Sequence, residues 1–168
     1  MATATGMTVA EYLATDYQPD REYVDGEVLE RNVGQGPHSY TQGFLMGPLL
    51  ANHKRLGVIP LPEQRVQVAA THFRVPDICL IRSEDFAPIV TMPPLLCIEI
   101  LSPEDRWPRI QESIDDYLQF GVPEVWVIDP EERKAWTCTL AGARPLLDSV
   151  LRWKDLAIEL SEILPPRE

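Results

Sequence analysis

Two short apolar runs near the middle of the chain predict two buried strands. The first reads VPDICLI over residues 75–81, and the second reads LLCIEILSP over residues 95–103. Each consists largely of Val, Ile, Leu and Cys and is bounded by proline or charge, which is typical of buried strands. Each also contains one carboxylate, Asp77 or Glu99, and a buried carboxylate is costly unless it is paired or bound to a cation. Two such acids on neighbouring strands indicate a shared cation.

The remaining pattern predicts an α/β fold with a mixed central β-sheet flanked by helices, in a single domain over residues 1–168. Thr8 and Glu11 have the spacing of a helix capping box, and Asp25-Gly26 is a strong hairpin signal. Gly47-Pro48 should kink or split the second helix, whereas Gly121 should end the third. The expected helices are 8–14, 38–55, 103–120 and a turn at 160–164; the hairpin is 22–31, and the strands are 58–61, 64–69, 73–81, 95–101, 124–128, 135–140 and 150–153.

Apolar stripes support the two longer helices. Residues 103–120 place Ile110, Ile114, Tyr117 and Leu118 at helical spacing, which predicts one buried face. In residues 38–55 the expected stripe consists of Phe44, Leu45, Leu49 and Leu50.

Length and composition fit a globular protein that stays inside the cell. The chain has 168 residues, 45% of them hydrophobic and 24% charged, and it lacks a run of about 20 apolar residues that could span a membrane. Residues 1–7 lack a basic start and an apolar signal core, so we expect a cytoplasmic location. Three cysteines in apolar runs are expected to be buried thiols in a reducing compartment.

The charge balance opposes nucleic-acid binding by the surface as a whole. The formal net charge is −11 and the isoelectric point is near 4.7. A local basic cleft is compatible with that balance, and carboxylates gathered at a metal site would contribute to it. The sequence contains no glycine-rich phosphate loop, nucleophile elbow or histidine cluster, which disfavours several classes of small-molecule enzyme.

Motifs in order along the chain resemble a known nuclease family. Pro76-Asp77 and Glu99 resemble the acidic motifs of the PD-(D/E)xK nuclease superfamily. The wider set resembles the Uma-type restriction endonuclease family over roughly residues 8–140. It comprises EYVDGE at 22–27, Pro76-Asp77, EILSP at 99–103, Asp116-Tyr117 and GVPEVWVIDP at 121–130.

The resemblance implies a restriction-endonuclease-like fold with an N-terminal helix and β-hairpin. It also implies an endodeoxyribonuclease that uses Mg²⁺ or Mn²⁺, acts on DNA and forms a homodimer. Asp77 and Glu99 would be the metal ligands, and Glu22 would be a third acidic member of the site. Solvent-facing or ion-paired strand ends are the alternative for Asp77 and Glu99, and an exposed strand position is the alternative for Glu22.

The chain departs from the family pattern at its catalytic lysine. The superfamily position, two residues after Glu99, is Leu101, and the family position on the following helix, four residues before Tyr117, is Ser113. Arg109 lies one helical turn before Ser113, so it could supply positive charge, although arginine is a poor proton acceptor. A solvated helix arginine is the alternative. The departure also favours a second hypothesis, a catalytically degenerate binding module of the same fold.

Two further residues are candidates for nucleic-acid contact. His38 begins a predicted helix and could approach a phosphate, or it could be an ordinary cap-region histidine. Arg65 lies on a strand expected to flank Asp77, where it could contact a phosphate or pair with a core carboxylate.

Overall fold

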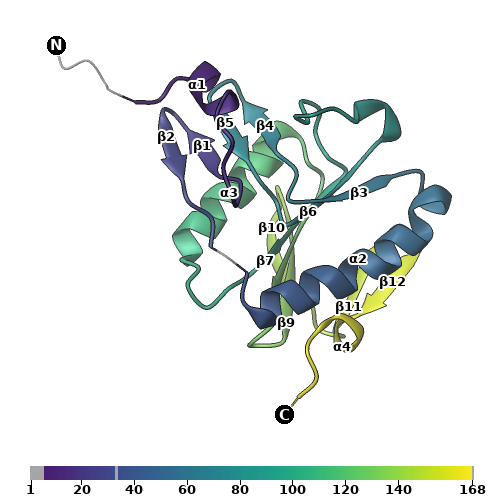
Figure 1. The fold of residues 1–168 in the computed structure, drawn as a ribbon. Helices are drawn as coiled ribbons and strands as arrows, with labels where there is room; N and C mark the ends of the chain where they lie inside the picture. Colours follow the sequence, from purple (N-terminus) through teal and green to yellow (C-terminus); the bar gives the residue numbers. More distant parts are fainter. Residues whose placement is uncertain (1–5, 33, 168) are drawn as a thin grey trace.

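Figure 1 shows the fold in a computed structural model, which describes residues 6–32 and 34–167. Residues 1–5, which carry most of the segment from which no export signal is predicted, lie outside the described residues. Within the described part, no helix is both long enough and apolar enough to cross a membrane. The helices are α1 (Val9–Leu13), α2 (Gly36–Leu56), α3 (Trp107–Phe120) and α4 (Leu160–Ile163), with a 3₁₀ turn η1 (Ser83–Asp85).

The strands form two sheets and a separate hairpin. The larger sheet has the order β10-β9-β8-β7-β6-β3, the smaller one has the order β2-β1-β5-β4, and β11 pairs with β12. The strands are β1 (Glu22–Val24), β2 (Glu27–Leu29), β3 (Ile59–Pro62), β4 (Val66–Ala69), β5 (His72–Arg74), β6 (Ile78–Ile81), β7 (Leu96–Ile100), β8 (Val125–Asp129), β9 (Lys134–Thr139), β10 (Gly142–Pro145), β11 (Val150–Trp153) and β12 (Leu156–Glu159).

The larger sheet is mixed, as the sequence predicts. Strands β7 and β8 are parallel and α3 connects them, whereas the other pairs of this sheet are antiparallel. Helix α3 ends at Gly121, whose φ of 114° is readily adopted only by glycine. The predicted stripe of α3 is confirmed, because Ile114, Tyr117 and Leu118 are buried and Ile110 packs against the same cluster.

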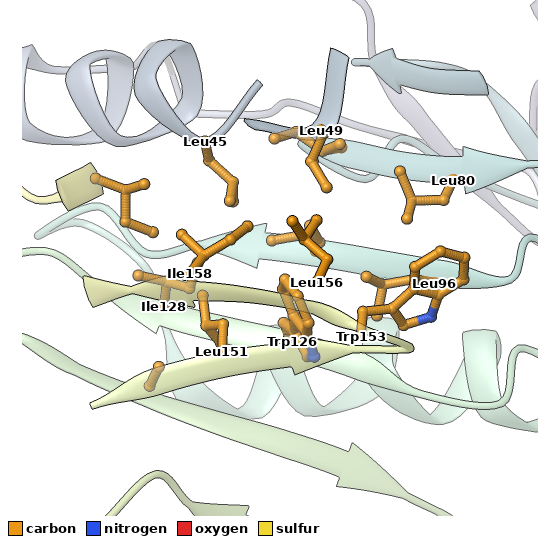
Figure 2. Packing of buried hydrophobic residues seen from close by; sticks show 14 of the residues in the cluster. Leu45, Leu49, Leu80, Leu96, Trp126, Ile128, Leu151, Trp153, Leu156 and Ile158 are labelled. Atoms are coloured by element: carbon orange, nitrogen blue, oxygen red, sulfur yellow. The ribbon is translucent and has the colours of Figure 1, made fainter. Parts of the chain in front are cut away.

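The two faces of this sheet are covered by different elements. Helix α2, α4 and the β11–β12 hairpin cover one face, where Leu45 and Leu49 meet Leu80, Leu96 and Trp126 (Figure 2). Helix α3 packs on the opposite face through a second apolar cluster. Trp126 of β8 belongs to the cluster on the α2 side, and its side chain is fully buried.

Helix α2 differs from its prediction in two respects. It continues through Pro48 without splitting, although proline removes one backbone donor. Leu45 and Leu49, on either side of Pro48, are both buried against the sheet, and this packing holds the helix together. The predicted stripe is only half right, because Phe44 and Leu50 are about half exposed.

The predicted strand over residues 73–81 is wrong as a single element. Strand β5 belongs to the smaller sheet and β6 to the larger one, and the segment Val75-Pro76-Asp77 joins them. Pro76 has no N–H to contribute to a strand ladder, so it suits a break between two sheets. The break places Asp77 at the junction of the sheets, immediately before β6.

The N-terminal helix and hairpin form the expected small layer. Thr8 and Glu11 make the predicted reciprocal capping box of α1. Tyr12 from α1 packs against Tyr23 and Phe73, so α1 and the smaller sheet share an aromatic cluster. At the other end of the chain, β11 and α4 match their predictions, whereas β10 and β12 were not predicted.

Candidate active site

Asp77 and Glu99 face each other from neighbouring strands. In the antiparallel pairing of β6 with β7, Cys79 lies opposite Cys97 and Ile78 opposite Ile98. The same register, continued by one residue, places Asp77 opposite Glu99. Like charges at opposite positions destabilise a strand pair unless positive charge is nearby. The arrangement is therefore one that a cation would stabilise.

The Glu99 carboxylate lies on the α3 face of β7. Tyr117 of α3 donates its hydroxyl hydrogen to Glu99 Oε1, with an oxygen–oxygen distance of 2.6 Å. Burial raises the pKa of Glu99 well above its usual value, and the negative charges of Asp77 and Glu22 raise it further. Burial and the neighbouring negative charges thus disfavour the ionised form of Glu99 more than Tyr117 and Arg31 favour it.

Asp77 is buried, and both of its oxygens have partners. Its Oδ2 accepts a hydrogen bond from the backbone N–H of Ile100 at 2.7 Å. Its Oδ1 lies 3.2 Å from Arg31 Nη2 and 3.1 Å from His38 Nε2. Burial alone would lower the pKa of His38, but the hydrogen bond and negative charge of Asp77 outweigh it and raise that pKa. His38 therefore lies at the acidic pair, and its partner in the structure is a carboxylate.

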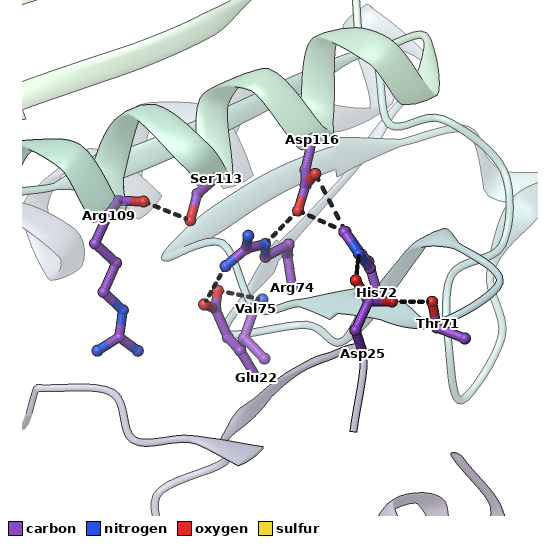
Figure 3. Close-up of polar contacts among 9 residues, drawn as sticks. All are labelled: Glu22, Asp25, Thr71, His72, Arg74, Val75, Arg109, Ser113 and Asp116. Carbon is purple, nitrogen blue, oxygen red and sulfur yellow. Dashed lines mark hydrogen bonds and ion pairs between the residues drawn. The ribbon is translucent and has the colours of Figure 1, made fainter. Parts of the chain in front are cut away.

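Glu22 is buried rather than exposed, and a buried arginine holds it. Arg74 Nη1 lies 3.1 Å from Glu22 Oε2, and the Val75 backbone N–H donates to Glu22 Oε1 at 3.1 Å. The same guanidinium donates through Nε to Asp116 Oδ2 at 2.7 Å (Figure 3). Arg74 is only 2% exposed, so this bridge ties β1 to α3 beside the acidic pair.

The network continues from Asp116 toward the hairpin turn. His72 contacts Asp116 through Nδ1 at 3.2 Å and Asp25 through Nε2 at 3.1 Å. Asp25 occupies the β1–β2 turn with a positive φ of 48°, which agrees with its predicted turn role. The chain of contacts thus runs from Glu22 to the exposed end of the smaller sheet.

One pocket collects most of the predicted site residues. Glu22, Asp77, Glu99, His38 and Arg109 all line it, as do the following further residues: Arg31, Asn32, Val75, Ile100, Ser102, Asp105, Ile110 and Ser113. Arg109 donates from Nη2 to the backbone carbonyl of Glu30, so its guanidinium is bonded to the segment that follows β2. The α3 helix thus contributes an arginine to the pocket, although the lysine of the family pattern is absent.

Arg65 and Trp107 do not line this pocket. Arg65 pairs with Asp20 and lies over the Tyr12 ring, 4.4 Å from its centroid. Arg65 immediately precedes strand β4, which pairs with β5 and not with the strand that follows Asp77. The expectation that Arg65 lies on a strand flanking Asp77 is therefore wrong. Trp107 is half exposed at the start of α3 and packs near Trp136.

The donor set fits a divalent cation that keeps part of its hydration shell. Mg²⁺ prefers hard oxygen ligands and is commonly held by one or two carboxylates together with waters and substrate phosphates. Asp77 and Glu99 supply two such groups at one pocket. Among residues 6–32 and 34–167, His, Cys, Asp and Glu side chains do not form any group of three or more that could hold an ion. Water and substrate oxygens would therefore complete the coordination.

Two arginines of the site escape sequence reasoning. Arg74 interrupts a run expected to be a core strand, and a charged residue in such a run signals a buried partner. Arg31 carries no local signal of this kind, because it is the last residue of the predicted hairpin, where an exposed arginine is ordinary. Only the folded chain brings Arg31 to Asp77, which lies 46 positions away in the sequence.

Comparison with known proteins identifies a family and a solved structure of similar fold. The family model Uma2, described as "Putative restriction endonuclease", matches residues 9–165. A crystal structure of "a putative nuclease belonging to DUF820" from Anabaena variabilis is similar with a TM-score of 0.83. It is 22% identical, and the likeness covers 94% of this chain and 97% of that one. At this identity the likeness confirms the restriction-endonuclease-like fold alone. No curated protein matches the chain.

Proposed function

Because the chain belongs to the Uma2 family of restriction endonuclease-like proteins, we propose that it is a metal-dependent endodeoxyribonuclease. Asp77 and Glu99 would bind Mg²⁺ or Mn²⁺, and the substrate would be a DNA phosphodiester. The observation that carries this proposal is the register of β6 and β7. Continued by one residue, it brings the buried Asp77 and the partly buried Glu99 together at one pocket.

The chemistry divides between the ion and the side chains of the pocket. A bound divalent ion would supply an activated water and relieve negative charge on the phosphate. Asp77 is oriented for ligation by the Ile100 N–H and Glu99 by the Tyr117 hydroxyl. Such fixed partners keep a ligand's oxygens in place. Glu22 is held by Arg74 and Val75, so its share would be to add negative charge and to accept a hydrogen bond from a water.

The local charge of the pocket supports a phosphate-bearing substrate despite the net charge of −11. Arg31, Arg109 and His38 all line the pocket beside the acidic residues. Such basic groups attract phosphate at short range, whereas the net negative charge of the chain weakens non-specific binding. A homodimer, in which each site cuts one strand, would complete a double-strand break.

A second candidate function is a binding module that keeps the fold without the chemistry. Leu101 and Ser113 at the two lysine positions favour this alternative. Leucine and serine side chains carry no charge. Leu101 packs with the apolar cluster under α3, and Ser113 donates to the Arg109 backbone carbonyl.

Plasmid nicking distinguishes the two functions. Wild-type protein, Asp77→Asn and Asp155→Asn would be incubated with supercoiled DNA in Mg²⁺, in Mn²⁺ and in chelator. Asp155 is an exposed aspartate outside the pocket and serves as the matched control. We expect ion-dependent nicking that falls on the order of a thousandfold in Asp77→Asn, because metal stabilisation of the transition state is worth several kcal/mol. Absence of nicking by folded wild type in both ions would leave only the binding module.

A further inference from the structure

The pocket needs positive charge that no lysine supplies. The three lysines are Lys54 in α2, Lys134 in β9 and Lys154 at the β11–β12 turn, and none of them lines the pocket. Phosphate recognition at an acidic site still requires a cationic side chain that reaches the phosphate directly. Arg31 is the pocket arginine in contact with Asp77.

Hydrogen bonds made by the two residues next to Arg31 in the chain hold it beside Asp77. The preceding residue, Glu30, accepts a hydrogen bond from Arg109 through its backbone carbonyl. The following residue, Asn32, donates from its side chain to Asp105 Oδ1 at 2.8 Å. Asp105 in turn accepts from the Ser102 backbone N–H at 2.6 Å. The segment after β2 is therefore fastened to the β7–α3 connection, and the Arg31 side chain is only 13% exposed.

Arg31 carries a positive charge at the pocket. An arginine guanidinium stays protonated in proteins, and Asp77 is its carboxylate partner at 3.2 Å. A guanidinium has five N–H donors, and Arg31 directs one of its two terminal nitrogens to Asp77. Among residues 6–32 and 34–167, the other donors of this guanidinium have no hydrogen-bond partner, and a guanidinium can make a planar, bidentate contact with phosphate oxygens.

We propose that Arg31 binds the phosphate of the nucleic-acid strand that enters the Asp77–Glu99 pocket, in place of the missing lysine. This rests on the proposed function, from which it takes the phosphodiester substrate. Arg31 stabilises charge on the phosphate and accepts no proton. Arg109, whose guanidinium donates to the Glu30 carbonyl, is a positioning residue for the Arg31 segment.

The test is DNA binding measured apart from cleavage. A short fluorescein-labelled duplex would be titrated with wild type, Arg31→Gln, Arg31→Lys and Arg144→Gln, in chelator and in Ca²⁺. Fluorescence anisotropy would be recorded at several salt concentrations. Arg144 lies on exposed β10 and does not line the pocket, so Arg144→Gln controls for the loss of one charge from the whole chain. Thermal unfolding of each variant checks that the fold is kept.

Arg31→Gln should weaken binding about ten- to a hundredfold, as expected for a lost charged contact. The slope of log K against log salt concentration should become shallower by about 0.9, the value for one phosphate. Arg31→Lys should recover part of the affinity, and Arg144→Gln should bind as wild type does. Binding by Arg31→Gln that matches Arg144→Gln would overturn the assignment. So would tighter Ca²⁺ binding with unchanged DNA affinity, because Arg31 would then only compete for Asp77.

Nicking by the same proteins separates this inference from the nuclease proposal. If the wild type binds DNA through Arg31 but never nicks it, the nuclease proposal is wrong and the phosphate contact stands. If nicking is lost in Asp77→Asn but unchanged in Arg31→Gln, the nuclease proposal stands and the phosphate contact is wrong. Arg109→Gln should weaken binding less than Arg31→Gln, since its side chain acts through the segment after β2.

Discussion

The two faces of strands β6 and β7 differ in chemistry although their residues alternate along the same backbone. Ile78, Leu80, Leu96 and Ile98 point toward α2 and the β11–β12 hairpin, where the contacts are apolar. The intervening positions point toward α3, and there the same strands carry Cys79 and Cys97 together with the Asp77–Glu99 pair. The apolar residues and cysteines named here are almost fully buried on both faces, as is Asp77, whereas Glu99 is partly exposed.

The difference shows how one sheet serves both stability and chemistry. The residues of β6 and β7 that point toward α2 are all apolar, so their contribution to stability comes from apolar area and close packing. The α3 face places carboxylates where burial penalises their charge, and it offsets that cost with Arg31, Arg74 and the Tyr117 hydroxyl. On the α3 face, removal of a buried cation should lower stability and removal of a buried negative charge should raise it. On the α2 face, removal of apolar volume should lower stability.

Removal of the buried arginine should have the largest effect on stability. Arg74→Met leaves Glu22 and Asp116 without their shared cation, and breaking such a pair costs about 3–5 kcal/mol. The loss would be measured as the change in free energy of unfolding in urea.

The matched control is Arg55→Met, which breaks the exposed pair with Asp155. Surface pairs contribute at most about 1 kcal/mol. Equal losses in Arg74→Met and Arg55→Met would show that the α3 face does not depend on its internal ion pairs.

On the apolar face, Ile98→Ala should destabilise the chain by about 2–5 kcal/mol. The side chain is fully buried within the cluster shared with α2, so its removal leaves a cavity. Urea unfolding measures the loss, and Ile89→Ala, at a partly buried position in another cluster, is the control. A loss no larger than that of Ile89→Ala would contradict close packing under α2.

Apolar runs along the chain predicted which strands are buried but not which sheet each strand joins. Short, nearly continuous apolar runs identify β6, β7 and β8, because a strand covered on both faces has few polar positions. The division of residues 73–81 between two sheets depends on pairing partners far along the chain, so Pro76 was the only local sign. Phe44 and Leu50 were assigned to the buried stripe for a related reason, since periodicity does not reveal how wide a face the sheet covers.

The acids of the site were predictable, whereas their cationic partners were not. A carboxylate within an apolar run is conspicuous in the sequence, and Asp77, Glu99 and Glu22 do line one pocket. Arginine in a polar segment is common, and its partner is fixed only by tertiary structure. The contact of Arg31 with Asp77 was therefore not predicted, and Arg65, which was expected near Asp77, pairs with Asp20.

A smaller effect, of opposite sign, is expected for Glu99→Gln in chelator. Burial, Asp77 and Glu22 raise the pKa of Glu99, so its ionised form is less stable in the folded chain than in the unfolded chain. Stability of the wild type should therefore fall as pH rises from the usual glutamate value of 4.5 through the raised value. Glutamine removes this penalty and keeps an acceptor for Tyr117.

The measurement is the free energy of unfolding of wild type and Glu99→Gln at acidic and neutral pH. The variant should be the more stable protein at neutral pH and equal to wild type below the usual glutamate pKa. Added Mg²⁺ should then stabilise wild type and not the variant. Destabilisation by Glu99→Gln at neutral pH would mean that the charge of Glu99 is already compensated without an ion.

The smallest expected effects are changes in the labelling rate of two buried thiols on the α3 face. Cys79 and Cys97 are fully buried opposite each other, two residues along their strands from Asp77 and Glu99 respectively. Burial raises the pKa of Cys79 to about 12 and that of Cys97 well above its usual value, so both are protonated thiols at neutral pH. Only the thiolate reacts, and only when the face opens. A disulfide reagent should therefore label both cysteines slowly, faster in Arg74→Met and more slowly in Glu99→Gln. Ile98→Ala, on the opposite face, should accelerate labelling only in proportion to its loss of global stability. The two faces share the same strands and should unfold together. Rapid labelling of the wild type would contradict this expectation, since the acid-bearing face would then open independently of the apolar one.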